Sequence, residues 1–285
     1  MENRYDKLFA KLKLSEKKAF IPYTLLGYPN VELSFQAMER MIKGGAAALE
    51  LGLAFSDPLA DGPVIQQASA ETIESGFKTK TAFELISRVR KLNEAIPITL
   101  MCYYNSVLAH GAKRFCKNAA DAGVDGLLIV DLPPDELLTD LPSNDEENNL
   151  LIQAKNNGLQ LIFIISPLTT EERLNLIAKQ AGGFLYAVSR LGTTGVEERY
   201  DSQLSELIRK ASEKIKLPVA VGFGVSSPEQ AKKMYSINAS AVITGSKIIE
   251  WINSIRMEKS TLDELQAYVQ SMVEAGNSPS LASKA

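Results

Sequence analysis

Three carboxylates that lie close together are the residues best suited to chemistry in this sequence. Glu50 lies inside the apolar run 47–53, and Asp57 and Asp61 follow in the polar stretch after it. An unpaired carboxylate is costly to bury, so it either finds a partner or keeps its proton. A glutamate with a raised pKa can exchange protons near neutral pH. Pairing of Glu50 with an arginine or with backbone amides is the alternative, and the two nearby aspartates favour acid–base chemistry.

Side-chain alternation indicates where Glu50 points. In a strand over 47–53, the leucines lie on one face, and Ala48, Glu50 and Gly52 lie on the other. The leucine face would pack under helices, so we expect Glu50 to point inward. The two small residues on the same face would leave space beside it.

Glycines after two later apolar runs predict a phosphate site. The run 218–222 continues into Gly222-Phe223-Gly224-Val225-Ser226, and the run 239–244 continues into Gly245-Ser246. Glycine lets a backbone N–H approach a phosphate closely, and a helix N-terminus favours an anion. Either pattern alone could be ordinary turn chemistry. Together, on consecutive runs, they favour phosphate binding.

The stretch 189–195, the lack of strand-end lysines and the single histidine limit the kinds of reaction that the site could catalyse. The stretch 189–195 combines glycines with hydroxyl residues, which suits a lid but equally an ordinary flexible loop. No predicted strand ends in lysine, which argues against a Schiff-base aldolase, and the single histidine, His110, is read as structural. An all-oxygen Mg-type site is the alternative use of the carboxylates. Its ligands would be Glu50, Asp57, Asp61 and Asp131.

Alternating apolar runs and helical stretches predict the elements that position these residues. The predicted strands are 20–26, 47–53, 97–103, 126–131, 159–166, 184–189, 218–222 and 239–244. The predicted helices are 32–44, 81–93, 112–122, 170–180, 202–214 and 228–235, with added helices at 3–12 and 261–274.

Eight such repeats favour a (β/α)8 TIM barrel with extra N-terminal and C-terminal helices, a fold of about 250 residues. A doubly wound open sheet is the alternative, but no glycine-rich dinucleotide fingerprint follows the first strand. In a barrel the chemistry lies at the carboxyl ends of the strands, where the carboxylates and glycines above are found.

Composition limits the partners and the domain organisation. The formal net charge of −3 argues against nucleic-acid binding, and no apolar run approaches the ~20 residues that span a bilayer. The charged start predicts no leader, and two cysteines without metal-ligand spacing fit a reducing cytoplasm. We expect one barrel domain over 1–275, a loop over 135–149 and a disordered tail over 276–285.

The stretch Glu50-Leu51-Gly52 followed by Phe55-Ser56-Asp57-Pro58-Leu59-Ala60-Asp61-Gly62-Pro63 closely resembles the signature of the tryptophan synthase alpha chain family. The resemblance continues in order along nearly the whole chain. It includes Ile65-Gln66, Tyr103-Tyr104-Asn105, Asp131-Leu132-Pro133, Ser189-Arg190, Gly192, Thr194-Gly195, Gly222-Phe223-Gly224 and Gly245-Ser246.

The resemblance implies a lyase of aromatic amino-acid biosynthesis, which cleaves indole-3-glycerol phosphate to indole and glyceraldehyde 3-phosphate by a retro-aldol reaction. It assigns proton transfer to Glu50, stabilisation of the indole N–H to Asp61, and a catalytic position to Tyr186. The implied substrate-binding residues are Tyr23, Ile65, Tyr103, Asp131 and Thr194. The implied phosphate-binding residues are Gly195, Phe223, Gly224, Gly245 and Ser246.

The resemblance also implies partners and cofactors. It predicts no metal and no cofactor in this subunit, and an α2β2 heterotetramer whose beta chain carries pyridoxal phosphate and receives the indole. Ala54, where the family usually has proline, and the long 135–149 stretch motivate an alternative: a weakly active chain that mainly activates the beta chain allosterically. Another phosphosugar barrel enzyme is a further alternative, although it would leave the 50–63 motif without a function.

Overall fold

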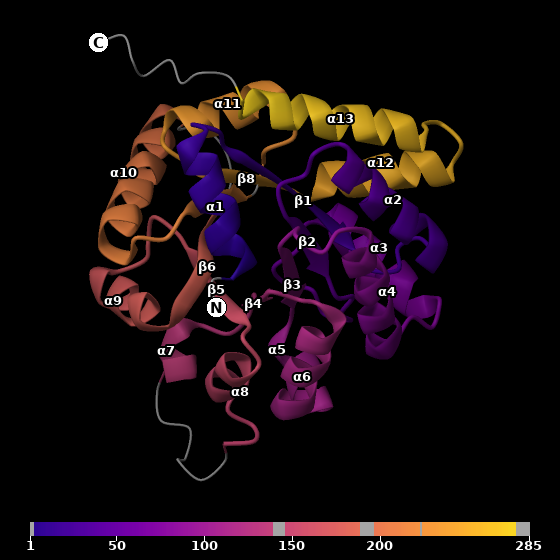
Figure 1. Ribbon diagram of the computed structural model, residues 1–285, viewed down its shortest axis with the longest axis horizontal. Coiled ribbons are helices and arrows are strands. Elements are labelled where there is room, and N and C mark those ends of the chain that lie inside the picture. Colours follow the sequence, from indigo (N-terminus) through magenta and orange to yellow (C-terminus); the bar gives the residue numbers. More distant parts are fainter. Residues whose placement is uncertain (1–2, 139–145, 189–196, 223, 278–285) are drawn as a thin grey trace.

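The structure is a computed structural model that describes residues 3–138, 146–188, 197–222 and 224–277. Eight parallel strands follow one another in sequence order and close into a barrel, with β1 paired to β8 (Figure 1). The strands are β1 Ala19–Leu25, β2 Leu49–Gly52, β3 Ile98–Cys102, β4 Gly126–Ile129, β5 Gln160–Ile165, β6 Ala181–Val188, β7 Val219–Gly222 and β8 Ala241–Thr244. The predicted barrel is confirmed, and the open sheet is wrong.

Helices surround the barrel, and α12 and α13 lie side by side along its upper edge in Figure 1. The helices before β5 are α1 Arg4–Leu14, α2 Val31–Lys43, α3 Pro63–Glu74, α4 Thr79–Leu92, α5 Tyr104–His110, α6 Ala112–Ala122, α7 Pro134–Leu138 and α8 Leu150–Asn156. The later ones are α9 Glu171–Gln180, α10 Glu197–Ile215, α11 Pro228–Ser236, α12 Ser246–Arg256 and α13 Leu262–Ala275. No helix in these ranges is long and apolar enough to cross a bilayer.

Local capping explains where several helices begin and end. Thr261 and Glu264 form a capping box at the start of α13, and Ser227 and Gln230 form another at the start of α11. Gly123 ends α6 in the left-handed region, at φ 98°, which glycine adopts without strain. These are local signals, so the bounds of these helices follow closely from the sequence.

Part of the 135–149 stretch differs from the predicted loop. α7 occupies Pro134–Leu138, with Asp135 and Glu136 in its first turn. Proline at the first helical position and acidic residues after it favour a helix start, a signal that the loop interpretation missed. Residues 139–145 lie outside the described residues. Of the expected tail, Gly276 caps α13, and residues 278–285 lie outside the described part.

The N-terminal end of the barrel is closed by α1, which packs near β6 (Figure 1). Tyr5 on α1 is fully buried, and its hydroxyl shares a 2.7 Å hydrogen bond with the Thr99 hydroxyl of β3. A Cβ at Gly126 would lie 2.9 Å from the Tyr5 hydroxyl, so glycine makes room for this plug. Because α1 closes this end, a binding cavity can open only at the opposite end of the barrel, where the carboxyl ends of the strands lie.

Candidate active site

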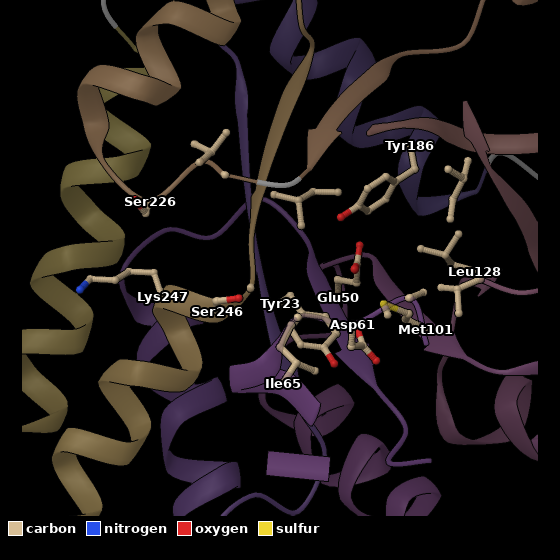
Figure 2. A pocket seen from close by; sticks show the side chains of 18 residues that line it. Tyr23, Glu50, Asp61, Ile65, Met101, Leu128, Tyr186, Ser226, Ser246 and Lys247 are labelled. Atoms are coloured by element: carbon tan, nitrogen blue, oxygen red, sulfur yellow. The ribbon is translucent and has the colours of Figure 1, made fainter. Parts of the chain in front are cut away.

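A cavity of about 330 Å³ opens at the carboxyl ends of the strands (Figure 2). Its walls combine inward strand positions with the loops that follow β2, β7 and β8. The lining residues are Tyr23, Glu50, Ala60, Asp61, Gly62, Ile65, Met101, Leu128, Val130, Ile164, Tyr186, Gly224, Val225, Ser226, Ile243, Gly245, Ser246 and Lys247. Figure 2 shows the carboxylates on one side of the cavity and Ser226 and Ser246 on the other.

Glu50 lies in the middle of β2 and points into this cavity, as alternation predicted. Glu50 is 1% exposed, and its Oε2 atom has no hydrogen-bond partner among the described residues. Burial raises the pKa of Glu50 to about 8, and the nearby charge of Asp61 contributes to the increase. The predicted raised pKa is therefore confirmed, and the alternative of an arginine-paired glutamate does not hold.

The space expected beside Glu50 is occupied by a tyrosine. A Cβ at Gly52 would lie 2.2 Å from the Tyr23 hydroxyl, so this ring fills the position above Glu50 on β2. The same arrangement recurs across the barrel, where a Cβ at Gly222 would lie 2.0 Å from the Tyr186 hydroxyl. Glycine at both strand ends thus admits an aromatic ring from the neighbouring strand.

Asp61 is half-buried in the β2–α3 loop and is held there by Tyr103, the residue directly after β3. Tyr103 donates a 3.0 Å hydrogen bond to the Asp61 carboxylate and accepts one of 3.0 Å from the Ala60 N–H. Burial raises the pKa of Asp61, and the bond from Tyr103 lowers it. The loop is thus less polar around Asp61 than the sequence suggested, while Tyr103 favours the ionised form.

Not every predicted residue reaches the cavity. Tyr103 supports the loop behind Asp61, with its ring stacked 4.8 Å from that of Phe55. Asp131 accepts a 2.7 Å hydrogen bond from the backbone N–H of Tyr104. Neither Tyr103 nor Asp131 is among the described lining residues. Contact of these two side chains with a substrate therefore remains a prediction, and the positions observed here are structural.

The predicted metal ligands do not converge. Asp57 is exposed and accepts a hydrogen bond from the Ser56 hydroxyl, and Asp131 lies against α5. Across the described part of the chain, no group of three or more acidic, histidine or cysteine side chains could hold a metal ion. The carboxylates Glu50, Asp57, Asp61 and Asp131 therefore do not form the all-oxygen site that was the alternative.

The glycine–serine end of the cavity is formed by two loops. Gly224 adopts φ 77° after β7, Gly245 precedes α12, and Ser246 is the first residue of α12. A Cβ at Gly245 would lie 3.2 Å from the Tyr23 ring and 3.4 Å from Ile65. Glycine at 245 thus leaves room for these two side chains, while the start of α12 at Ser246 gives the helix N-terminus that the predicted phosphate site calls for. Thr194, Gly195 and Phe223, and the predicted lid over 189–195, lie outside the described residues.

Sequence reasoning missed most of the apolar lining. The missed strand positions are Met101, Leu128, Ile164 and Ile243. These alternate inward on β3, β4, β5 and β8, so the pattern that found Glu50 could have found them. Ala60 and Gly62 belong to the 50–63 motif, and Val225 and Ser226 belong to the stretch that predicted the phosphate site. Val130 and Lys247 carry no signal of their own.

The chain matches one family over nearly its full length. The family model described as Tryptophan synthase alpha chain matches residues 9–277. A curated relative, the tryptophan synthase alpha chain of Francisella tularensis subsp. tularensis (strain FSC 198), is 38% identical over 276 residues, which is 96% of this chain and 99% of the relative. This chain belongs to the tryptophan synthase alpha chain family.

Other members of this family are similar to the chain in sequence or in structure over nearly the full length. The tryptophan synthase alpha chain of Methanosarcina barkeri is 38% identical over 93% of this chain and 95% of its own length. The crystal structure of tryptophan synthase subunit alpha from Legionella pneumophila str. Paris superposes with a TM-score of 0.84 at 34% identity, covering 96% of this chain and 98% of that one. A chain of Mycobacterium tuberculosis tryptophan synthase has a TM-score of 0.84 at 28% identity, with 98% and 100% covered.

Proposed function

We infer that this chain is a carbon–carbon lyase that cleaves indole-3-glycerol phosphate to indole and glyceraldehyde 3-phosphate. The observation that carries this inference is Glu50: a buried carboxyl with an unpartnered oxygen and a pKa of about 8, aimed into the cavity. Asp61 lies on the same cavity, and the glycine–serine end lies across from both. The cavity therefore has one wall that can contact an aromatic ring and another that can bind a phosphate.

The reaction follows from the two protonation states of Glu50. At neutral pH the carboxyl keeps its proton and donates it to C3 of the indole ring. The resulting carboxylate then removes the proton of the glycerol hydroxyl, that oxygen becomes the aldehyde, and the C–C bond breaks with its electron pair returning to the ring. One proton is given and one is taken back, so Glu50 ends as it began.

Asp61 and the tyrosines take the supporting roles. Positive charge on the ring nitrogen is stabilised by an ionised Asp61, whose charge Tyr103 supports. Tyr23, Ile65 and Tyr186 line the cavity. We assign Tyr23 and Ile65 to contact with the indole ring and Tyr186 to the reacting carbons. The backbone at Gly224, Gly245 and Ser246 binds the phosphate, with Gly195 and Phe223 completing the cradle. The family resemblance assigns substrate binding to Thr194 and Asp131 as well, and these two roles remain predictions.

We propose that a tryptophan synthase beta chain, which carries the pyridoxal phosphate, receives the indole in an α2β2 assembly, and that this chain needs no cofactor of its own. Large exposed apolar side chains in the segments that follow three strands support a partner at this end of the barrel. Leu59, Leu108 and Leu168 follow β2, β3 and β5 and are 92%, 53% and 73% exposed. The free cysteines Cys102 and Cys116 fit a cytoplasmic location.

The Glu50→Gln variant tests the proposed reaction. Glutamine keeps the shape of the side chain but has no proton to transfer, so we expect kcat to fall by about a thousandfold or more, with substrate affinity changed little. Glu74→Gln, an exposed glutamate on α3, is the matched control and should keep wild-type turnover. Indole release is measured with and without a beta chain.

Two outcomes would contradict the proposal. Wild-type turnover by Glu50→Gln would remove Glu50 from the reaction. Negligible indole formation by the wild-type chain, both alone and with a beta chain, would favour the alternative of an allosteric partner, which the exposed leucines fit equally well.

A further inference from the structure

The loop after β7 forms one wall of the glycine–serine end, and other elements hold its carbonyl groups. The Thr244 hydroxyl at the end of β8 donates a 2.8 Å hydrogen bond to the carbonyl of Val225. The Tyr268 hydroxyl on α13 donates a 3.0 Å hydrogen bond to the carbonyl of Ser226. Two consecutive carbonyls of a cavity wall are therefore fixed from outside the loop.

The same loop is held on its other side by α11. The Gln230 side chain accepts hydrogen bonds from the backbone N–H groups of Ser226 and Ser227, at 2.8 and 3.2 Å. Ser226 is thus bound through both its N–H and its carbonyl. Gly224, at φ 77°, Val225 and Ser226 all line the cavity, so the position of Ser226 affects how this segment faces the cavity.

Tyr268 is well placed for this bond. Its ring packs against Trp251 of α12, with centroids 5.9 Å apart, so the side chain is supported from the helix that begins at Ser246. Burial raises the pKa of Tyr268, so its hydroxyl keeps its proton and remains a donor. The ring and the hydroxyl therefore link α12, α13 and the β7–α11 loop.

We propose that Tyr268 is a positioning residue for phosphate binding: through the carbonyl of Ser226, its hydroxyl fixes the 224–226 wall against which the substrate phosphate binds. This inference rests on the proposed function, which places the phosphate at the glycine–serine end. Backbone donors bind an anion well only at short distances, so a small displacement of this wall weakens binding. The hydrogen bond of Tyr268 goes to this wall and not to Tyr23, Ile65 or Tyr186 at the aromatic-ring end of the cavity.

The Tyr268→Phe variant removes the hydroxyl and keeps the ring packing on Trp251. We expect the Kd for inorganic phosphate and for glycerol 3-phosphate, measured by calorimetry, to rise about fivefold, which corresponds to one lost hydrogen bond. KM for indole-3-glycerol phosphate should rise to a similar extent. Neither kcat nor the Kd for indole should change more than about twofold, because neither depends on the phosphate wall.

Tyr235→Phe is the matched control. Its hydroxyl also donates to a backbone carbonyl, that of Ala19, at 2.9 Å, but at the opposite end of the barrel. We expect it to lower stability without changing the phosphate Kd. The proposal is overturned if the phosphate Kd is unchanged in Tyr268→Phe, or if phosphate binding weakens equally in Tyr235→Phe. It is also overturned if the indole Kd of Tyr268→Phe rises as much as its phosphate Kd, or if the wild-type chain binds no phosphate. A weakened phosphate Kd in Tyr268→Phe, with a wild-type chain that does not cleave the substrate, would support the positioning role and refute the proposed reaction.

Discussion

At the scale of single residues, the protonation of Glu50 links the chemistry of the site to stability. The unfolded glutamate ionises near pH 4.5, whereas the folded one keeps its proton up to a pH of about 8. Between these values the folded state binds more protons than the unfolded state, so stability falls as the pH rises. The contribution of Glu50 is fully present below pH 4.5 and is lost by the time the pH passes about 8.

Glu50→Gln should therefore become progressively more stable than the wild-type chain as the pH rises. Between pH 5 and pH 8 we expect the difference in the free energy of unfolding to grow by roughly 3 kcal/mol, since one pKa unit corresponds to about 1.4 kcal/mol. Urea unfolding at several pH values measures it. Glu74→Gln should show no such trend, and a pH-independent difference for Glu50→Gln would mean that the carboxyl is ionised in the folded state.

The inward direction of Glu50 could be predicted from sequence because alternation is a local property of one strand. The position of Tyr23 could not be, because its hydroxyl lies over Gly52 only when β1 and β2 pair with Tyr23 opposite Glu50. That register depends on the closed barrel. The same holds for Tyr186 over Gly222.

At the scale of elements, all eight strands were predicted, since each lies in a short and mainly apolar run between helical stretches. Eight helices were also predicted, with bounds within a few residues except at the start of α10; they are α1, α2, α4, α6, α9, α10, α11 and α13. The 11-residue α12 was missed. The missed elements include α5, α7 and α8, which have only five to seven residues. A period of 3.6 cannot be read from two turns. α3 was missed for another reason, because its start at Pro63 was read as part of the catalytic motif.

The β2–α3 loop gives the prediction that belongs to this scale. Because the Tyr103 hydroxyl both supports Ala60 and lowers the pKa of Asp61, Tyr103→Phe should free the loop and raise that pKa further. If ionised Asp61 is needed, activity is lost as the pH falls, so the acid side of the kcat profile should move to higher pH. We expect kcat at neutral pH to fall about tenfold.

Tyr104→Phe is the control for Tyr103→Phe. Tyr104 is the next residue, and its backbone N–H, which the substitution keeps, donates a hydrogen bond to Asp131. Its profile should match that of the wild-type chain. An acid side that stays in place in Tyr103→Phe would show that Tyr103 does not act through the ionisation of Asp61.

At the scale of the whole molecule, chemistry and stability lie at opposite ends of the barrel. The cavity occupies the carboxyl ends of the strands, while the N-terminal end holds a charged cluster around Asp125. Asp125 is 8% exposed and accepts hydrogen bonds from Arg4 at 2.6 Å, Arg90 at 2.7 Å and the Ile98 N–H at 2.8 Å. It joins α1, α4 and β3 immediately before β4 begins.

Asp125→Asn should therefore destabilise the fold without altering the site. The substitution leaves the charge of Arg90, which is 13% exposed, without its buried partner, and we expect a loss of about 2–4 kcal/mol in the free energy of unfolding. Asp121→Asn, which removes an exposed ion pair with Lys117, should cost less than about 0.5 kcal/mol. Urea unfolding measures both, and kcat and KM are compared at a temperature where each variant is folded. A change in kcat or KM for Asp125→Asn under those conditions would show that the two ends of the barrel are coupled through the strands. If Asp125→Asn has the same free energy of unfolding as Asp121→Asn, the cluster around Asp125 does not stabilise the barrel.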